Sequence, residues 1–218
     1  MPTLHRVNLP QIPENSSFCP LSNNILLTTY QGSTLVPLEN PIAASVPSGQ
    51  AWVPTPRGLN GVSPDGRWAA IFTPFDNELH IYRLPGLDVA ATLTNRAEIR
   101  TFEFSPRGDE LAVTSRGHLE FWSTKTWERT HELTNVLDIL YSPNGAGWWL
   151  TRDYRSGGLY DSHSGQPLLP LPTGTLPIAV SPDGRYLAAS VDSRYVEVWD
   201  LAEVRLRLRE LGMDWQDN

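Results

Sequence analysis

The sequence predicts an all-β fold in which about five similar sheets of up to four antiparallel strands follow one another, ending in a short helix. Three observations lead to this fold class. A short turn rich in proline and glycine recurs five times in 218 residues, and apolar runs flank each turn. The 19 prolines and 16 glycines suit many short strands and frequent turns better than long helices.

The recurring turn is the main signal. It reads FCPLSN, VSPDG, FSPRG, YSPNG and VSPDG, and its prolines are 37 to 44 residues apart. This spacing is close to the ~40–45 residues of one four-stranded propeller blade. Proline presets φ for the first central position, and glycine supplies a positive φ, so each turn joins two antiparallel strands. The five prolines are Pro20, Pro64, Pro106, Pro143 and Pro182.

Apolar runs after the turns predict the strands. Runs that are apolar on both faces are typical of strands packed between neighbouring sheets. Second strands are expected at Ile25–Tyr30, Trp68–Phe72, Leu111–Thr114, Trp148–Thr151 and Tyr186–Ser190. Third strands are expected at Ser33–Leu38, Glu78–Tyr82, His118–Trp122, Gly158–Asp161 and Tyr195–Asp200, and fourth strands at Ile42–Val46, Val89–Leu93, Glu128–Leu133 and Leu168–Leu171.

These repeats predict a single β-propeller domain over residues 1–218. Its five blades are expected at about 16–46, 59–94, 99–133, 136–171 and 176–200. The last blade needs a fourth strand, and both Thr3–Leu9 and Val204–Leu208 alternate as a strand would.

A helix at about 201–211 is preferred for the C-terminal segment. Asp200 and Glu203 have capping-box spacing, apolar residues recur at helical spacing, and Gly212 lies where a left-handed stop belongs. The N-terminal strand, residues 3–9, would then close the ring.

The final repeat, VSPDGRYLAASVDSRYVEVWDL, closely resembles the WD40 repeat, from its SPDG turn to Trp199-Asp200. The tail AEVRLRLRELGMDW is similar to the segment after the last blade of bacterial, planctomycete-type WD40 proteins. Other repeats replace Trp-Asp, and the usual Gly-His pair is missing. The resemblance implies a propeller that binds other molecules. Because seven blades are usual in that family, a fragment of a larger propeller is an alternative.

Composition and motifs argue against several function classes. The net charge of −7 disfavours nucleic-acid binding, which needs a basic face. No signal peptide or membrane span is recognisable, and Cys19 is the only cysteine, so a cytoplasmic protein is expected. The five histidines lack metal-ligand spacing, and no nucleophile elbow, phosphate loop or dinucleotide motif occurs. We therefore predict no enzymatic activity, no metal and no cofactor.

The candidate binding face is formed by loops between second and third strands, together with loops between blades. The richest run is Arg152–Arg155, which combines two arginines with a tyrosine, residue types that dominate interface energetics. The candidate partner-binding residues are Trp52, Phe75, Arg116, Arg152, Asp153, Tyr154, Arg155 and Arg194.

The leading functional hypothesis is a non-catalytic scaffold of the WD40 type that binds proteins or peptides. Two alternatives stay open. One is a five-bladed propeller that binds or cleaves carbohydrate, since exposed aromatic rings such as those of Trp52 and Tyr154 would stack on sugars. The other is the C-terminal sensor or regulatory segment of a larger protein. A closed ring predicts a monomer, whereas an open one exposes strand edges that would pair into a dimer.

Overall fold

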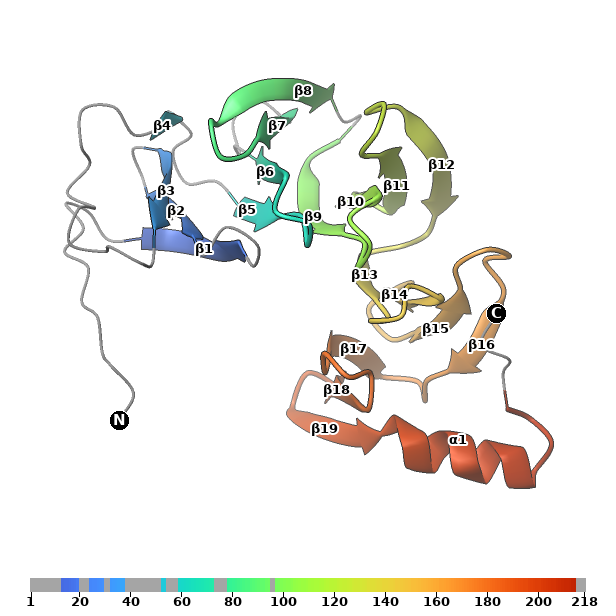
Figure 1. Ribbon diagram of the computed structural model, residues 1–218. Coiled ribbons are helices and arrows are strands. Elements are labelled where there is room, and N and C mark those ends of the chain that lie inside the picture. The colour runs from blue at the N-terminus through green and yellow to red at the C-terminus, as the bar shows by residue number, and fades with distance from the viewer. Residues whose placement is uncertain are drawn as a thin grey trace, which may run out of the picture. The chain divides into compact units, whose positions relative to one another are not determined.

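The computed structural model describes residues 13–19, 24–29, 32–37, 52–53, 59–72, 78–94 and 97–214. In these ranges the protein is all-β apart from one short helix, as the sequence predicts (Figure 1). The strands form five separate antiparallel sheets, four of them with four strands and one with three. No helix in the described ranges is both long and apolar enough to span a membrane.

The strands follow one another in chain order within each sheet. The first two sheets are β1 (Pro13–Cys19), β2 (Asn24–Thr29), β3 (Ser33–Pro37) and β4 (Trp52–Val53), then β5 (Leu59–Val62), β6 (Trp68–Phe72), β7 (Glu78–Arg83) and β8 (Asp88–Thr94). The next two are β9 (Ile99–Phe104), β10 (Glu110–Ser115), β11 (His118–Ser123) and β12 (Arg129–Thr134), then β13 (Asp138–Tyr141), β14 (Gly147–Thr151), β15 (Gly157–Asp161) and β16 (Pro167–Pro170). The last contains β17 (Thr175–Val180), β18 (Tyr186–Val191) and β19 (Tyr195–Asp200).

Four of the five predicted turns are described from end to end, and they share one geometry. The amide of each turn glycine donates to the carbonyl of the serine before the proline at 2.8 Å, and each glycine has a φ between 65° and 73°. Each serine hydroxyl also accepts the amide of the residue that begins or precedes the second strand. A side-chain hydrogen bond from the serine thus joins the turn to the start of the second strand, in addition to the backbone bonds of the hairpin. The serines are Ser63, Ser105, Ser142 and Ser181.

Two predicted strands differ from the structure or cannot be compared with it. The fourth strand of the first sheet is Trp52–Val53, not Ile42–Val46, because β3 pairs with residues 52–53. The predicted segment Ile42–Val46 lies outside the described residues. The predicted ring-closing strand Thr3–Leu9 also lies outside them, and the last sheet has three described strands instead of four.

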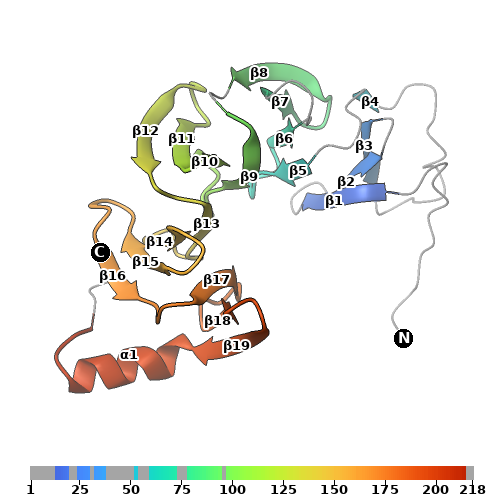
Figure 2. The ribbon, with the colours of Figure 1, turned by 180° about the vertical axis from the view of Figure 1, so that it is seen from behind.

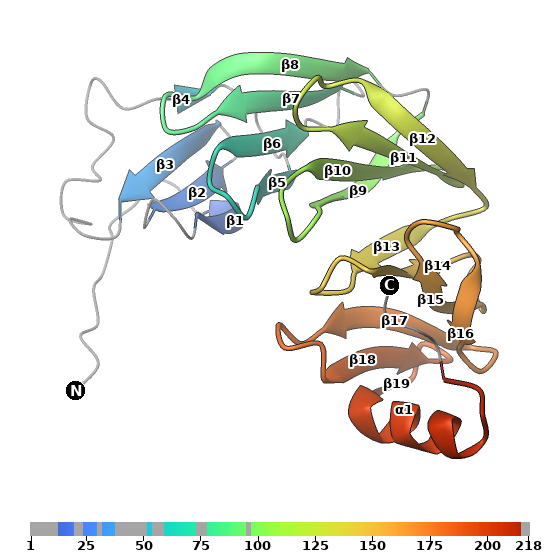
Figure 3. The ribbon, with the colours of Figure 1, turned by 45° about the vertical axis from the view of Figure 1, so that its right-hand side comes forward.

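The chain divides into two compact units, Met1–Leu111 with Ser123–Glu128, and Ala112–Trp122 with Arg129–Asn218. In the second unit, Figures 2 and 3 show the sheet β13–β16 beside β17–β19. Two core clusters fill this unit. In one, Leu119 and Phe121 of β11 pack with Ile139 and Trp148 of the following sheet.

The second cluster repeats the same packing one sheet later. Trp149 and Leu159 pack with Leu187 of β18 and with Leu201, which begins the helix. Successive sheets in this unit thus stack face to face through alternate side chains. On β19 the matching positions are Val196 and Val198, which remain 60% and 68% exposed.

The helix α1 spans Leu201–Glu210, close to the predicted 201–211. The Asp200 carboxylate caps it by accepting the amides of Ala202 and Glu203. Glu203 does not complete a capping box, because its carboxylate pairs with Arg207 at 3.0 Å. Gly212 stops the helix with a φ of 69°.

We predict that Leu119→Ala destabilises the protein by about 2–5 kcal/mol, the usual range for emptying a buried leucine site. The matched control is Val196→Ala, at the equivalent position of the last sheet, which should change stability by less than about 0.5 kcal/mol. Chemical denaturation of both variants measures the difference. Equal losses for the two variants would contradict the stacking order described above.

Candidate functional site

The loop Arg152–Ser156, between β14 and β15, is a tight turn organised by a carboxylate. Asp153 Oδ1 accepts the amide of Arg155 at 2.7 Å, and its Oδ2 accepts the Ser156 hydroxyl at 2.7 Å. The amide of Arg152 donates to the Ser156 carbonyl at 2.9 Å. The Ser156 hydroxyl, followed by the Arg155 amide, lowers the pKa of Asp153 below its ordinary value. The loop is thus held in one conformation while its carboxylate stays charged.

Arg152 anchors this loop to its surroundings. Its guanidinium donates to the Thr134 carbonyl at 3.0 Å and lies over the ring of Tyr160, 4.7 Å from the ring centre. The side chain is therefore engaged on both sides and only half-exposed. Arg152 is a positioning residue of the loop, although the sequence suggests a contact residue.

Tyr154 is the most exposed large hydrophobic side chain in the described part of the chain, at 76%. It lies at the tip of the ordered turn between Asp153 and Arg155. The preceding residue, Asp153, accepts the amide of the following residue, Arg155, and the Arg155 carbonyl accepts the Gly174 amide, so the ring is held on a hydrogen-bonded turn. A rigid, exposed aromatic ring is the type of group that anchors interfaces at low entropic cost.

Three segments meet at this loop. The Gly174 amide donates to the Arg155 carbonyl at 2.7 Å, and the Asp192 amide donates to the Gly174 carbonyl at 2.8 Å. The Arg155 guanidinium also lies 4.0 Å from the Asp192 carboxylate. A Cβ at Gly174, whose φ is 86°, would clash with the Asp192 side chain. Glycine at 174 therefore permits the close approach of these loops.

The structure brings together most of the predicted binding residues in the second unit. Arg194 is exposed in the β18–β19 turn, beside Asp192. Arg116 is exposed in the β10–β11 turn. The carbonyl of the next residue, Gly117, accepts the Val136 amide at 3.4 Å, and Val136 lies two residues after Thr134, whose carbonyl binds Arg152. We call this surface the loop face and define it by Arg116, Arg152, Asp153, Tyr154, Arg155, Asp192 and Arg194.

Two predicted residues are not placed at the loop face. Trp52 is in the short strand β4 of the first unit, and its side chain is not described. Phe75 lies outside the described residues. The contacts of Gly174 and Asp192 with this loop join different repeats, so no local sequence pattern indicates them.

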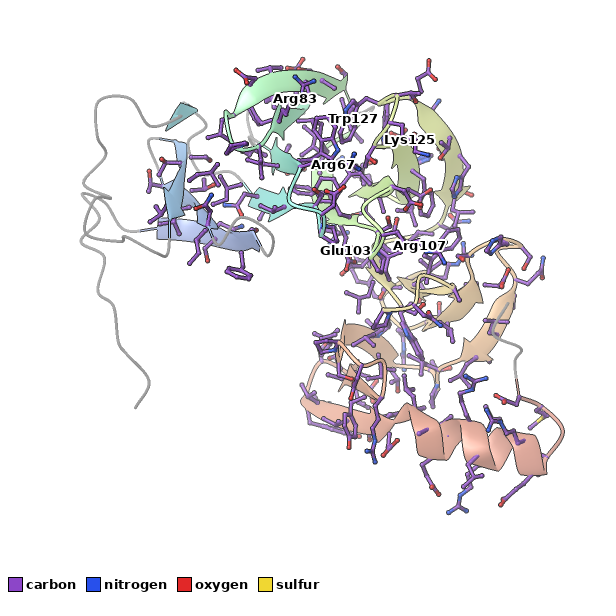
Figure 4. The ribbon with its side chains drawn as sticks, in the orientation of Figure 1. Arg67, Arg83, Glu103, Arg107, Lys125 and Trp127 are labelled. Atoms are coloured by element: carbon purple, nitrogen blue, oxygen red, sulfur yellow. The ribbon has the colours of Figure 1, made fainter. Side chains whose placement is uncertain are left out.

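A second group of charged side chains lies in the first unit at the turn ends, by which we mean the ends of the strands where the proline turns join the first strand to the second. Figure 4 labels Arg67, Arg83, Arg107, Lys125 and Trp127 there, with Glu103 nearby. Asp65, Asp109 and Glu128 lie in the same turns, so this surface has both signs of charge. Among the residues described, no group of three or more His, Cys, Asp or Glu side chains could hold a metal ion.

Comparison with known proteins supports the fold alone. No protein-family model matches the chain, and no curated protein does. Among solved structures, the chain is similar to hydrazine synthase of Kuenenia stuttgartiensis, with 15% identity and a TM-score of 0.64. The match covers 90% of this chain and 67% of that one. In all, 1205 solved chains match, so this architecture is widespread and does not by itself define a function.

This likeness corrects one prediction. We predicted from the absence of catalytic motifs that the chain is not an enzyme, but the structure that it resembles is that of an enzyme. The prediction was wrong because it treated the absence of short sequence motifs as evidence about chemistry. In a repeat fold, groups that act together come from loops of different repeats, as Arg155 and Asp192 do here.

The hydrogen bonds to Asp153 predict a pH dependence of the loop. Because folding lowers the pKa of Asp153, its stabilising effect is present above the unfolded pKa of about 4 and is lost as the pH falls through the folded value. Ser156→Ala removes the largest cause, so the pKa of Asp153 should rise towards its ordinary value. Titration of the Asp153 carboxyl carbon by NMR measures this shift.

Ser164→Ala is the matched control. The Ser164 hydroxyl lowers the pKa of Asp161 in the same way, so this variant should raise the pKa of Asp161 and leave that of Asp153 unchanged. A Ser156→Ala protein in which Asp153 titrates as before would show that the loop is not organised as described.

Proposed function

We propose that this chain is a β-propeller of the WD40 type that binds a partner protein through the loop face. The repeated SPDG-type turns and the last repeat support the WD40 resemblance, and the five antiparallel sheets support the propeller. The structural similarity to a larger solved chain also supports this fold. A cytoplasmic location is part of this proposal, because a lone cysteine forms no intrachain disulfide that would favour an oxidising compartment.

The single observation that carries the proposal is the exposed ring of Tyr154 on a hydrogen-bonded turn. When a partner covers a large apolar side chain that was exposed to solvent, the free energy of the complex falls relative to that of the separate proteins. Binding costs are lowest when the side chain is already held in place, because little conformational freedom is then lost. The loop satisfies this condition through Asp153, Arg152 and the Gly174 contacts.

The charges around Tyr154 indicate the chemistry of the partner. Arg155 and Arg194 are exposed guanidinium groups, and Arg155 has only a long surface contact with Asp192. Such an exposed pair contributes little to stability and exchanges readily for a better-placed carboxylate. We therefore expect the partner to present an apolar pocket for the phenol ring with acidic or carbonyl groups at its rim.

Quantitative affinity capture from the native host tests this proposal. Tyr154→Ala should lower recovery of the specific partner at least tenfold, as expected for loss of an aromatic interface anchor worth about 2 kcal/mol. The matched control is Tyr186→Ala, since Tyr186 is also exposed and also lies beside an arginine, Arg185, but at the turn end of β18. This control should retain the partner.

Partner recovery that is equal for wild type and Tyr154→Ala would overturn the assignment of the loop face. A glycan array distinguishes a protein partner from the carbohydrate alternative. If the wild type binds a glycan, Tyr154→Ala does not, and no protein is recovered, the ligand of the loop face is a sugar and not a protein.

A further inference from the structure

The four described turns make positions in different sheets directly comparable. Each turn serine donates its amide to the carbonyl of the residue that follows the turn: Ser63 to Trp68, Ser105 to Glu110, Ser142 to Gly147, and Ser181 to Tyr186. Trp68 and Gly147 therefore occupy the same place in their sheets. Each is also paired with the last residue of the third strand of its sheet, Arg83 and Asp161 respectively.

In the first unit, the space beside Trp68 is filled by a second indole. The rings of Trp68 and Trp127 meet edge to face, with centres 5.2 Å apart at an angle of 88°. Figure 4 shows Trp127 among Arg83 and Lys125 at the turn ends. Trp127 has a φ of 55°, in the left-handed region that bulky residues rarely adopt. The equivalent residue of the next repeat is Gly165, which closes the same turn.

In the second unit, the equivalent space is hollow. Gly147 replaces the indole of Trp68, and the first turn of α1 replaces the turn that supplies Trp127. Between the sheets β13–β16 and β17–β19 lies a cavity of about 240 Å³. Leu159 packs against the backbone of Gly147: a Cβ at this position would lie 2.9 Å from Leu159 Cδ1 and 3.0 Å from the Tyr160 carbonyl oxygen, so a larger residue would have to displace them.

The lining of this cavity has an apolar floor and a polar mouth. Trp149, Leu159, Leu168, Val180 and Leu201 provide the apolar surface, and Asn144, Asp183 and Arg205 provide the polar groups. The Arg205 guanidinium is already neutralised by Asp214 at 3.1 Å, so the mouth does not select an anion. Asp183 keeps a carboxylate oxygen at the mouth while its Oδ1 accepts the Ser181 hydroxyl and the Arg185 amide.

We propose that this cavity binds an aromatic side chain of a partner protein, an indole above all, in the place that Trp68 and Trp127 fill in the first unit. Its volume is below the about 300–1,000 Å³ of sites for drug-sized ligands, so it fits a single side chain better than a cofactor. The mouth offers Asp183 as acceptor for the indole N–H. This site lies at the turn ends of the strands, away from the loop face, and does not depend on the function proposed above.

Titration of the 218-residue chain with N-acetyltryptophanamide, followed by NMR, tests this site. Binding should have a Kd on the order of 1 mM or tighter, as expected for so small a ligand, and should shift the amide signals of Gly147 and Gly184. Val180→Phe fills the cavity and should weaken binding at least tenfold while raising the Tm. A more stable variant cannot have lost binding by unfolding.

Two further variants keep the test decisive. Leu168→Phe fills the cavity from β16 and should act like Val180→Phe even if that variant is overpacked. Val196→Phe places the same ring on the exposed face of β19 and should leave the Kd unchanged.

The proposal fails if N-acetyltryptophanamide does not bind at about 10 mM, an order of magnitude above the expected Kd. It also fails if both filling variants bind as wild type does. Binding of free indole but not of N-acetyltryptophanamide would assign the cavity to a free small molecule and overturn the partner side chain.

Discussion

The hydroxyl of the serine before each turn proline accepts the amide at the start of the second strand, and this contact recurs in every turn that the structure describes fully. In the turns of Ser63, Ser142 and Ser181 the same hydroxyl donates to the Asp or Asn two residues later, at 2.5–2.9 Å. In the turn of Ser105 it donates instead to Asp109, four residues later, at 2.7 Å. Because a shift of one residue would exchange the two faces of a strand, this turn decides which side chains each sheet turns to its neighbours.

The stacking of the sheets in the second unit follows from this register. Leu119 and Phe121 are buried because the next sheet presents Ile139 and Trp148 to them. The same positions on β19 are valines that face water. The two ends of the sheets also differ in the length and sequence of their loops. The turn ends are short and repeat closely, whereas the loops at the other end vary in sequence and carry Tyr154 and its arginines.

Local sequence patterns predicted most of the strands because the turn and the apolar run are both local. The second strand Trp68–Phe72 and the third strand Tyr195–Asp200 have their predicted bounds. The fourth strand of the first sheet was misplaced, because an outer strand has little apolar pattern of its own and its position depends on the pairing of β3 with Trp52–Val53. Most of the loop face was predicted from the positions of the loops between the second and third strands, together with the residue types in them.

The sequence does not predict contacts between residues of different repeats. Arg152 reads as a contact residue, yet it is held by the Thr134 carbonyl and the Tyr160 ring. The missing side chain of Gly174 lets Asp192 of the next hairpin approach, and no pattern within one repeat indicates this. The cavity beside Gly147 is lined by residues of two sheets and of the helix α1, so no pattern within a single repeat would reveal it.

Amide hydrogen exchange in the four turns tests the central claim, that one hydrogen-bonded turn fixes the hairpin between the first and second strands in each of these four sheets. The amides of Gly66, Gly108, Gly145 and Gly184 each donate to a serine carbonyl at 2.8 Å, so all four should exchange far more slowly than an unstructured amide and with similar protection. Exchange at the unprotected rate in any one of the four would contradict the claim, because that hairpin would then need another source of register.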